Sequence, residues 1–313
     1  MAGVILVAGE ALIDLVPVSD AIDALAAHPG GGPFNAARTI ARLERPVAYL
    51  GRLSRDRFGQ RLEALLAEDG VRLDAVVHTD EPTTLALADV DELGVARYRF
   101  YTRGTAAAGL TSEAALAARP DEVQIVHAGT LGLALEPTAS ALEAVIARLS
   151  GRAMVFIDPN VRPDVIADAA AYRERLTRVL SMSHVVKVSE EDLDWLAPGR
   201  RSVDAVRAYL AEGPTVGLLT RGPSGALVIT QTAEVAVPSP RTTVVDTIGA
   251  GDAFGGGFVA WWHARGLGRE DLSDIDAAAA AAEFACLIAA RTSSDSPGAS
   301  PPRLSELEAG VLG

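Results

Sequence analysis

The chain is poor in cysteine, in aromatic residues and in positive charge, and these shortages exclude several classes of protein. Cys286 is the only cysteine among 313 residues, so an intrachain disulfide and a zinc site of paired cysteines are both excluded. We expect Cys286 to be a small buried side chain in an alanine-rich helix. The chain has 28 Lys and Arg against 41 Asp and Glu, a formal net charge of −13, and no basic cluster. This balance argues against a nucleic-acid partner.

Long hydrophobic runs are also missing. The longest apolar stretch, 277–290, is interrupted by Glu283 and is short for a membrane span. The first ten residues are apolar but have no basic leader, so they predict a first strand rather than a signal peptide. We therefore expect a cytoplasmic protein with no membrane partner. The length suits one large α/β domain, and we treat residues 1–313 as a single domain.

Short apolar runs alternate with amphipathic stretches over most of the chain. The predicted strands are 3–8, 46–50, 123–128, 153–157, 184–188 and 215–220, and the predicted helices are 33–44, 57–69, 136–149, 169–180, 190–196 and 202–211. Strands that alternate with helices predict an α/β fold in three layers, with a mainly parallel central sheet covered on both faces.

Two segments depart from this alternation. Residues 11–18 form a second extended run, and 83–89 and 95–101 alternate apolar and polar residues around the turn signal 91–94, which is a hairpin pattern. Because strands with one polar face do not suit a doubly covered sheet, we place both segments in a small β lid formed by about 11–32 and 82–104. A decorated edge of the main sheet is the alternative. Residues 292–302, rich in Ser, Pro and Gly, predict a loop.

The strongest chemical signal is the string Asp-Thr-Ile-Gly-Ala-Gly-Asp at 246–252. The β-rich stretches 234–237 and 242–245 precede it and an apolar segment follows, which predicts a loop that opens a helix. Free N–H groups at a helix start attract an anion, and the glycines let the backbone approach it. A carboxylate at Asp252 beside such an anion can accept the proton of an attacking hydroxyl. The alternative is an Asp that merely complements the helix dipole.

The string at 246–252 resembles the C-terminal signature of the ribokinase-like (PfkB) carbohydrate kinases. Residues 30–35, Gly-Gly-Gly-Pro-Phe-Asn, resemble that family's N-terminal signature. Further matches follow in the family's order at 9–14, 158–162, 187–190 and 220–226, and together they span nearly the whole chain. The resemblance implies a ribokinase-like domain with a β lid, which uses ATP and Mg²⁺ to phosphorylate a sugar hydroxyl.

The resemblance also implies roles for individual residues around the reacting groups. Asp252 matches the catalytic base, and an anion hole is implied at the N–H groups of Gly249, Ala250 and Gly251. The positions that hold the sugar match Asp14, Gly31, Gly32 and Asn35. A carboxylate accepts hydrogen bonds from neighbouring hydroxyls, and an amide both donates and accepts, so these residue types suit a sugar. A tight turn before the helix at Pro33 also explains the glycines.

The nucleotide side is implied by a second set of matches. It comprises Asn160, Lys187, Thr220, Gly222 and Gly225, with Glu190 as a Mg²⁺ position that acts through water and Asp246 beside a monovalent cation site for K⁺. Many relatives carry Asn where this chain has Lys187, which could reach the phosphates directly. A plain hairpin turn is the alternative at 220–225. Ser189 and Asp192 form a capping-box pattern, which explains Ser189 without any function.

Fewer residues bear on the identity of the sugar. Residues 9–14, 158–163 and 297–302 look closest to bacterial fructokinases, and we favour fructose over 2-keto-3-deoxygluconate; a nucleoside is a distant third, because no aromatic cluster marks a base pocket. Arg162 could face a substrate carboxylate or an ATP phosphate. Tyr98, Tyr101 and Arg103, on the lid hairpin, could reach the sugar or simply pack, and Tyr101 is our candidate for a further sugar contact. A sugar-binding protein without catalysis remains the alternative from another class, and a homodimer through the lid is expected.

Overall fold

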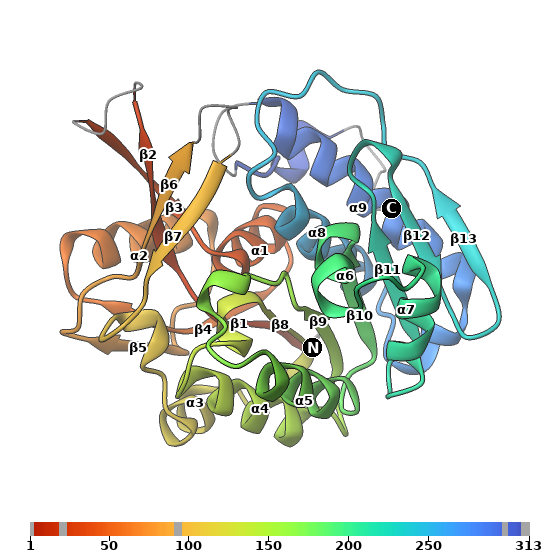
Figure 1. Ribbon diagram of the computed structural model, residues 1–313, viewed down its shortest axis with the longest axis horizontal. Coiled ribbons are helices and arrows are strands. Elements are labelled where there is room, and N and C mark those ends of the chain that lie inside the picture. Colours follow the sequence, from red (N-terminus) through yellow and green to blue (C-terminus); the bar gives the residue numbers. More distant parts are fainter. Residues whose placement is uncertain (1–2, 19–23, 91–95, 296–299, 308–313) are drawn as a thin grey trace.

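A computed structural model of the chain places a large central sheet between two layers of helices, with a second, small sheet standing at one end (Figure 1). The structure describes residues 3–18, 24–90, 96–295 and 300–307. Within these residues, no helix is long and apolar enough to cross a lipid bilayer.

The central sheet has nine strands in the order β13-β12-β11-β10-β9-β8-β1-β4-β5. Their bounds are β1 (Val4–Ala8), β4 (Val47–Ser54), β5 (Val76–Thr79), β8 (Val123–Gly129), β9 (Met154–Asp158), β10 (Val185–Ser189), β11 (Val216–Thr220), β12 (Ala226–Ile229) and β13 (Glu234–Val237). All neighbouring pairs from β5 to β11 are parallel, and β12 and β13 continue the sheet antiparallel. The predicted mainly parallel sheet is confirmed.

Helices cover both faces of this sheet. One layer contains α1 (Gly32–Arg42), α2 (Arg57–Asp69), α8 (Ala250–Ala264) and α9 (Ile275–Asp295), and the other contains α3 (Ser112–Ala118), α4 (Thr138–Leu149), α5 (Ala169–Leu180), α6 (Glu190–Leu196) and α7 (Ser202–Leu210). Each layer encloses its own apolar core because alternate residues of a strand point to opposite faces. In β1, Ile5 and Val7 therefore face the first layer and Leu6 faces the second.

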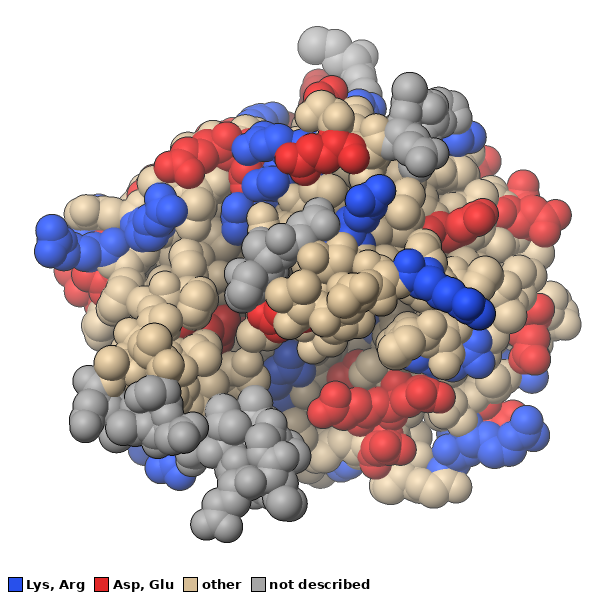
Figure 2. Space-filling model, turned by 90° about the horizontal axis from the view of Figure 1, so that it is seen from above, with Lys and Arg blue, Asp and Glu red and all other residues tan. Residues whose placement is uncertain are grey.

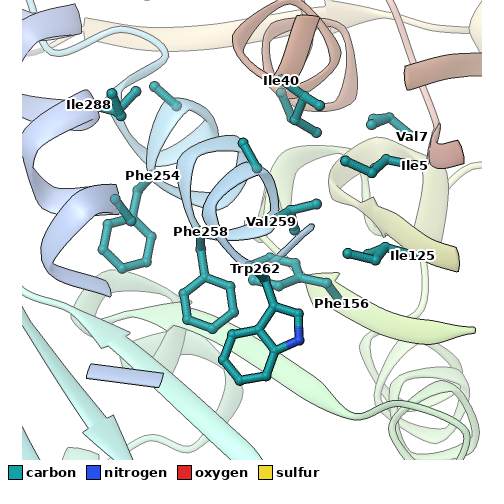
Figure 3. Close-up of a cluster of buried hydrophobic side chains, with 14 of the residues drawn as sticks. Ile5, Val7, Ile40, Ile125, Phe156, Phe254, Phe258, Val259, Trp262 and Ile288 are labelled. Carbon is teal, nitrogen blue, oxygen red and sulfur yellow. The ribbon is translucent and has the colours of Figure 1, made fainter. Parts of the chain in front are cut away.

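The core of the first layer is built around α8. Phe254, Phe258 and Trp262 of this helix lie between Ile288 of α9 and the sheet, whose Phe156 packs against Phe258 with ring centroids 5.8 Å apart (Figure 3). Phe258 and Trp262 stack at 5.7 Å, four residues apart on one helix face. The packing fixes the direction of α8, and therefore the position of its first turn.

The small sheet has the order β3-β2-β6-β7 and forms the lid. Its strands are β2 (Leu12–Pro17), β3 (Leu25–Gly30), β6 (Leu85–Val90) and β7 (Ala96–Tyr101); β2 pairs antiparallel with β3 and parallel with β6, and β6 pairs antiparallel with β7. The predicted turn at 91–94 lies outside the described residues. One face of the sheet, with Leu12, Ala86 and Phe100, packs against Leu131 and Val165 of the main body.

Two local predictions were wrong. Residues 242–245 form no strand, although β-branched residues such as Val244 and Val245 favour one. These two side chains are 53% and 54% exposed. The predicted loop begins later than expected, because 292–295 belong to the last turn of α9. Thr292 and Ser293 fit the helix by donating their hydroxyls to the carbonyls four residues back, at 2.9 and 3.1 Å. Residues 296–299 lie outside the described residues. Cys286 is buried in α9, as predicted.

The carboxyl ends of the parallel strands lie along one edge of the central sheet. Glu10 follows β1, Thr130 follows β8, Asn160 follows β9 and Glu190 follows β10 at this edge. In open α/β sheets ligands bind outside the carboxyl ends of the strands. The fold therefore collects most of the predicted site residues in one place.

Candidate active site

Asp252 lies in the first turn of α8, 8% exposed. The helix begins after Gly249, whose φ of 76° is in the left-handed region that glycine adopts without strain. The N–H groups of Gly249 and Gly251 have no acceptor within the described residues, whereas that of Ala250 donates to the carbonyl of Thr247 at 3.2 Å. The carboxylate thus lies beside free amides at the positive end of a helix.

Asn35, which lies on another helix, holds the Asp252 carboxylate with a hydrogen bond. Its Nδ2 donates a hydrogen bond to Oδ2 of Asp252 at 2.9 Å, although the two residues are 217 positions apart. Asn35 lies in the first turn of α1, which follows the glycine turn and begins with Pro33. The other amide atom, Oδ1, is buried and has no partner in the described structure. A buried acceptor without a donor is a place for a ligand hydroxyl.

Asp14 lies on β2 of the lid, close enough to Asp252 for the charge of Asp252 to affect its pKa. The pKa of Asp14 is raised to about 7, first by burial and also by the negative charge of Asp252, while the Arg162 guanidinium opposes the rise. Asp14 is therefore close to half protonated at neutral pH when no ligand is present. Hydroxyl donors from a sugar would favour its charged form.

The glycine turn before α1 leaves space that a side chain would fill. Gly31 has a φ of 109°, which disfavours any other residue. A Cβ placed on Gly32 would lie 2.5 Å from Cγ2 of Thr130 and 3.1 Å from Oδ1 of Asp252. Gly32 therefore borders the Asp252 carboxylate directly. Both the tight turn and the open space for a sugar require glycine. Both explanations of Gly31 and Gly32 offered by the sequence therefore apply.

Glu10 holds the glycine turn through a hydrogen bond. It was assigned no role in the sequence analysis. Its buried carboxylate accepts hydrogen bonds from the hydroxyl of Thr130, from the N–H of Gly132 at 3.1 Å and from the N–H of Gly32 at 3.3 Å. Burial raises the pKa of Glu10 to about 7; the hydrogen bonds oppose this rise and the charge of Asp252 adds to it. Its position between β1 and the glycine turn was the only available signal, since Thr130 is 120 residues away.

Lys187 approaches the start of α8 from β10. It is 3% exposed, and its Nζ lies 2.8 Å from Oδ2 of Asp158. A Cβ on Gly251 would lie 3.2 Å from the same Nζ, so the ammonium group neighbours the free amides. Burial lowers the pKa of Lys187, but the carboxylates of Asp158, Asp192 and Asp252 outweigh it and the pKa is raised. The lysine is therefore a permanent positive charge beside the helix start.

Asn160 and Arg162 lie on the same side as the sugar candidates. Nδ2 of Asn160 is 3.4 Å from Oδ1 of Asp252, and Oδ1 of Asn160 accepts a hydrogen bond from Nη1 of Arg162 at 2.7 Å. The resemblance assigned Asn160 to the nucleotide, and its observed contact is with the Asp252 carboxylate. The structure thus joins Arg162, Asn160, Asp252 and Asn35 in one chain of polar contacts.

The remaining nucleotide candidates lie at the next strand ends. Thr220 ends β11, and its hydroxyl is 3.4 Å from the carbonyl of Val188. Gly225 has a φ of 84°, and a Cβ there would lie 2.1 Å from the carbonyl oxygen of Val237, so close backbone packing explains this glycine. Gly222, with a φ of 51°, starts the turn between β11 and β12.

The two metal candidates, Glu190 and Asp246, both precede the free amides in the chain. Glu190 is the first residue of α6 and is exposed, and Ser189 and Asp192 form the expected capping box there. Oδ1 of Asp246 accepts the N–H of Ile248 at 2.9 Å. No three His, Cys, Asp or Glu side chains of the described residues are grouped so that they could hold a metal ion.

Tyr101 does not join this cluster in the structure. It is 51% exposed, and it lies on the opposite face of β7 from Tyr98 and Phe100 because strand side chains alternate. Tyr98 is the lid tyrosine near the site. Burial raises the pKa of its hydroxyl, and the charges of Asp14 and Asp246 raise it further.

A carboxylate beside free helix amides and a buried lysine is an arrangement that suits phosphoryl transfer to an alcohol. The family model for pfkB family carbohydrate kinases matches residues 4–300. A fructokinase of Rhizobium leguminosarum bv. trifolii is 36% identical over 259 residues, which cover 82% of this chain and 78% of the relative.

Solved structures agree with this family. A fructokinase from Xylella fastidiosa with bound ATP has a TM-score of 0.89 at 31% identity, covering 98% of this chain and 97% of its own. A fructokinase double mutant from Vibrio cholerae O395, with fructose, ADP and potassium bound, has a TM-score of 0.82 at 26% identity, covering 95% and 94%. The chain belongs to the pfkB family of carbohydrate kinases. It is an enzyme that transfers a phosphoryl group to a sugar.

Proposed function

We propose that this enzyme phosphorylates a hydroxyl group of fructose with ATP as the donor. The observation that carries the proposal is the Asp252 carboxylate, held by Asn35 at 2.9 Å beside the free amides of α8. The relatives named above are fructokinases, one of them solved with ATP and another with fructose and ADP. A sugar-binding protein without catalysis would have no need of a base beside an anion hole.

In the proposed reaction Asp252 takes the proton of the sugar hydroxyl. The hydroxyl oxygen then forms a bond to the γ-phosphorus of ATP, while the bond from that phosphorus to the bridging oxygen breaks and ADP leaves. The N–H groups of Gly249 and Gly251 stabilise the charge on the transferred group. Ala250 can join them only if its N–H leaves the carbonyl of Thr247. Lys187 adds a positive charge on the same side.

The sugar is proposed to lie between the glycine turn and the lid. Asp14 and the free Oδ1 of Asn35 accept its hydroxyl hydrogens, and Gly31 and Gly32 give it access to the backbone. Nη1 of Arg162 donates to both oxygens of Asn160, so Arg162 holds Asn160 at this site. Tyr98 takes the place that the sequence gave to Tyr101.

The nucleotide is proposed to extend from the anion hole past Thr220, Gly222 and Gly225. A cavity of about 560 Å³ lies farther along α8, and its lining includes Pro238, Ser239, Trp261, Phe284 and Leu287. Trp261 is nine residues beyond Asp252, or ~13 Å along the helix axis. This separation suits a nucleoside whose triphosphate ends at Asp252. Gly225 packs against Pro238 and Ser239, which connects the turn to this cavity.

The metal sites are proposed to be shared with the nucleotide. Mg²⁺ binds through one or two carboxylates, several waters and substrate phosphates rather than in a cage of protein ligands. An exposed Glu190, without a group of three acids in the described structure, fits this arrangement. Mg²⁺ would neutralise phosphate charge. Asp246 and nearby carbonyls would supply a K⁺ site, next to the anion hole.

We also propose that 1–313 acts as one cytoplasmic kinase domain whose lid comprises about 11–32 and 82–104, and that two chains pair through the lid. Three apolar side chains of the lid are exposed, Val18 at 66%, Leu25 at 37% and Tyr101 at 51%. Exposed apolar groups gathered on a small sheet are typical of an interface. Light scattering should give twice the chain mass, and a monomer at working concentration would remove this part of the proposal.

The direct test of the function is a coupled assay of ADP release with a panel of sugars. Fructose should give the highest kcat/KM, above 2-keto-3-deoxygluconate and nucleosides. Higher kcat/KM for 2-keto-3-deoxygluconate would reassign the substrate. Tight fructose binding without any ADP release would restore the non-catalytic alternative.

A further inference from the structure

An arginine-lined cavity of about 250 Å³ lies at the opposite end of α1 from Asn35. The described residues that line it are Arg42, Arg291, Ser300, Pro301, Pro302 and Glu306. Arg42 is the last residue of α1 and Arg291 is near the end of α9. None of these residues takes part in the sugar or nucleotide site described above.

Positive charge is concentrated beside this cavity. The buried carboxylate of Asp69 accepts Arg38 at 2.7 Å, Arg303 at 3.1 Å and Arg42 at 3.4 Å. Three guanidinium groups around one carboxylate leave an excess of positive charge, in a chain whose net charge is −13. On the face shown in Figure 2, by contrast, acidic and basic side chains are interspersed. The cluster is therefore a local feature that the overall composition does not predict.

The two arginines of the cavity have unused donors. The side chain of Arg42 is 13% exposed, Asp69 is its single ion-pair partner among the described residues, and its buried Nε has no partner there. The Arg291 guanidinium makes no hydrogen bond or ion pair with any described residue. Burial lowers the pKa of Arg42, the charge of Asp69 opposes this, the neighbouring Arg303 and Arg38 lower the pKa further, and Glu306 opposes them. An anion in the cavity would relieve this repulsion between like charges.

We propose that this cavity binds a phosphate group between Arg42 and Arg291, carried by a small sugar phosphate or present as free phosphate. A guanidinium offers parallel N–H donors that match phosphate oxygens. Ser300 and Glu306 line the same cavity and can bond the hydroxyls of an ester, which free phosphate lacks. The site lies outside the catalytic centre, and its existence does not depend on which sugar the enzyme phosphorylates.

The cavity is connected to the catalytic loop through α9. Arg291 precedes Ser293 by two residues, and the carbonyl of Ser293 accepts the N–H groups of Val245 at 2.8 Å and Asp246 at 3.2 Å. These residues begin the segment that enters the anion hole at Gly249. A ligand on Arg291 is thus two residues from the hydrogen bonds that anchor this segment.

Calorimetric titration tests the proposal. The enzyme is first saturated with fructose and a non-hydrolysable ATP analogue, and inorganic phosphate or fructose 6-phosphate is then added. We expect one saturable site per chain, with affinity at least tenfold lower in Arg291→Gln. The matched control is Arg148→Gln, because Arg148 is an exposed arginine of α4 whose guanidinium has no partner in the described structure, and it should bind as the native enzyme does.

The two probes separate the two sources of phosphate. Tighter binding of fructose 6-phosphate supports an ester that also uses Ser300 and Glu306, and equal binding supports recognition of the phosphate group alone. Absence of saturable binding by both probes, or equal affinity in native enzyme and Arg291→Gln, would overturn the proposal. Arg291 is exposed, so its variant should melt at the native temperature and leave the test interpretable.

Discussion

Nδ2 of Asn35 donates a hydrogen bond to Oδ2 of Asp252 at 2.9 Å, which joins the first turns of α1 and α8. The bond orients the carboxylate and leaves the other amide atom of Asn35 facing the site as an unpaired acceptor. One side chain therefore connects the proposed sugar pocket to the proposed catalytic base.

Replacement of Asn35 by Ala should raise the KM for the sugar about fivefold, because a lost hydrogen bond costs ~1 kcal/mol. A fall in kcat should accompany it, since the Asp252 carboxylate loses its support. Steady-state kinetics with varied sugar measure both. An unchanged KM for the sugar, with the KM for ATP raised instead, would place Asn35 on the nucleotide side.

The sugar KM should depend on pH because burial raises the pKa of Asp14 to about 7. The charged carboxylate accepts hydrogen bonds from two hydroxyls, whereas the protonated form accepts fewer. The KM for the sugar should therefore fall as the pH rises from 6 to 8. Asp14→Asn should weaken binding and flatten this profile. A profile that keeps its shape in Asp14→Asn would assign the titration to another group, with Glu10 the first candidate.

Glu10 should make stability decrease with rising pH. Its pKa is about 7 in the folded protein and near 4.5 when unfolded, so the folded state holds the proton more tightly between these values. Stability from this group is present below pH 4.5 and is lost as the pH rises to about 7, by on the order of 3 kcal/mol. Denaturant unfolding at pH 5 and pH 8 measures this loss. The free energy of unfolding of Glu10→Gln should rise relative to that of the native enzyme at the higher pH. A constant difference would refute the shifted pKa.

Lys187→Met should both destabilise the fold and weaken ATP binding. Removal of the ammonium leaves Asp158 buried and unpaired, which costs ~3–5 kcal/mol. The double variant Lys187→Met/Asp158→Asn should recover most of this stability, yet keep the raised KM for ATP. Recovery of both properties in the double variant would show that Lys187 acts only through its ion pair.

Much of the fold follows from local pattern. Alternating strands and helices predict the parallel sheet, and the polar faces of 83–89 and 95–101 predict the separate lid. Strand order depends on long-range packing, so the parallel pairing of β2 with β6 could not be read from the sequence. Val244 and Val245 show that β-branched residues alone do not identify a strand, because such residues also occur outside a sheet.

The site was predicted best where a motif is contiguous, as at 246–252. Glu10 was missed because its partners Thr130 and Gly132 lie more than 100 residues away, and a buried carboxylate has meaning only through such partners. The choice between Tyr98 and Tyr101 shows a second limit. Alternation places Tyr98 and Tyr101 on opposite faces of a strand, but only the packed lid shows which face is turned inward.

The most direct test of the account is the turnover of Asp252→Asn with saturating sugar and ATP. The amide keeps the size of the side chain and can still bond to Asn160, but it cannot accept the hydroxyl proton. Since general base catalysis contributes ~10²–10⁴-fold, kcat should fall by at least a hundredfold, while calorimetry shows sugar binding and a melting curve shows the fold retained. Near-native kcat in this variant would contradict the assignment of Asp252 as the base.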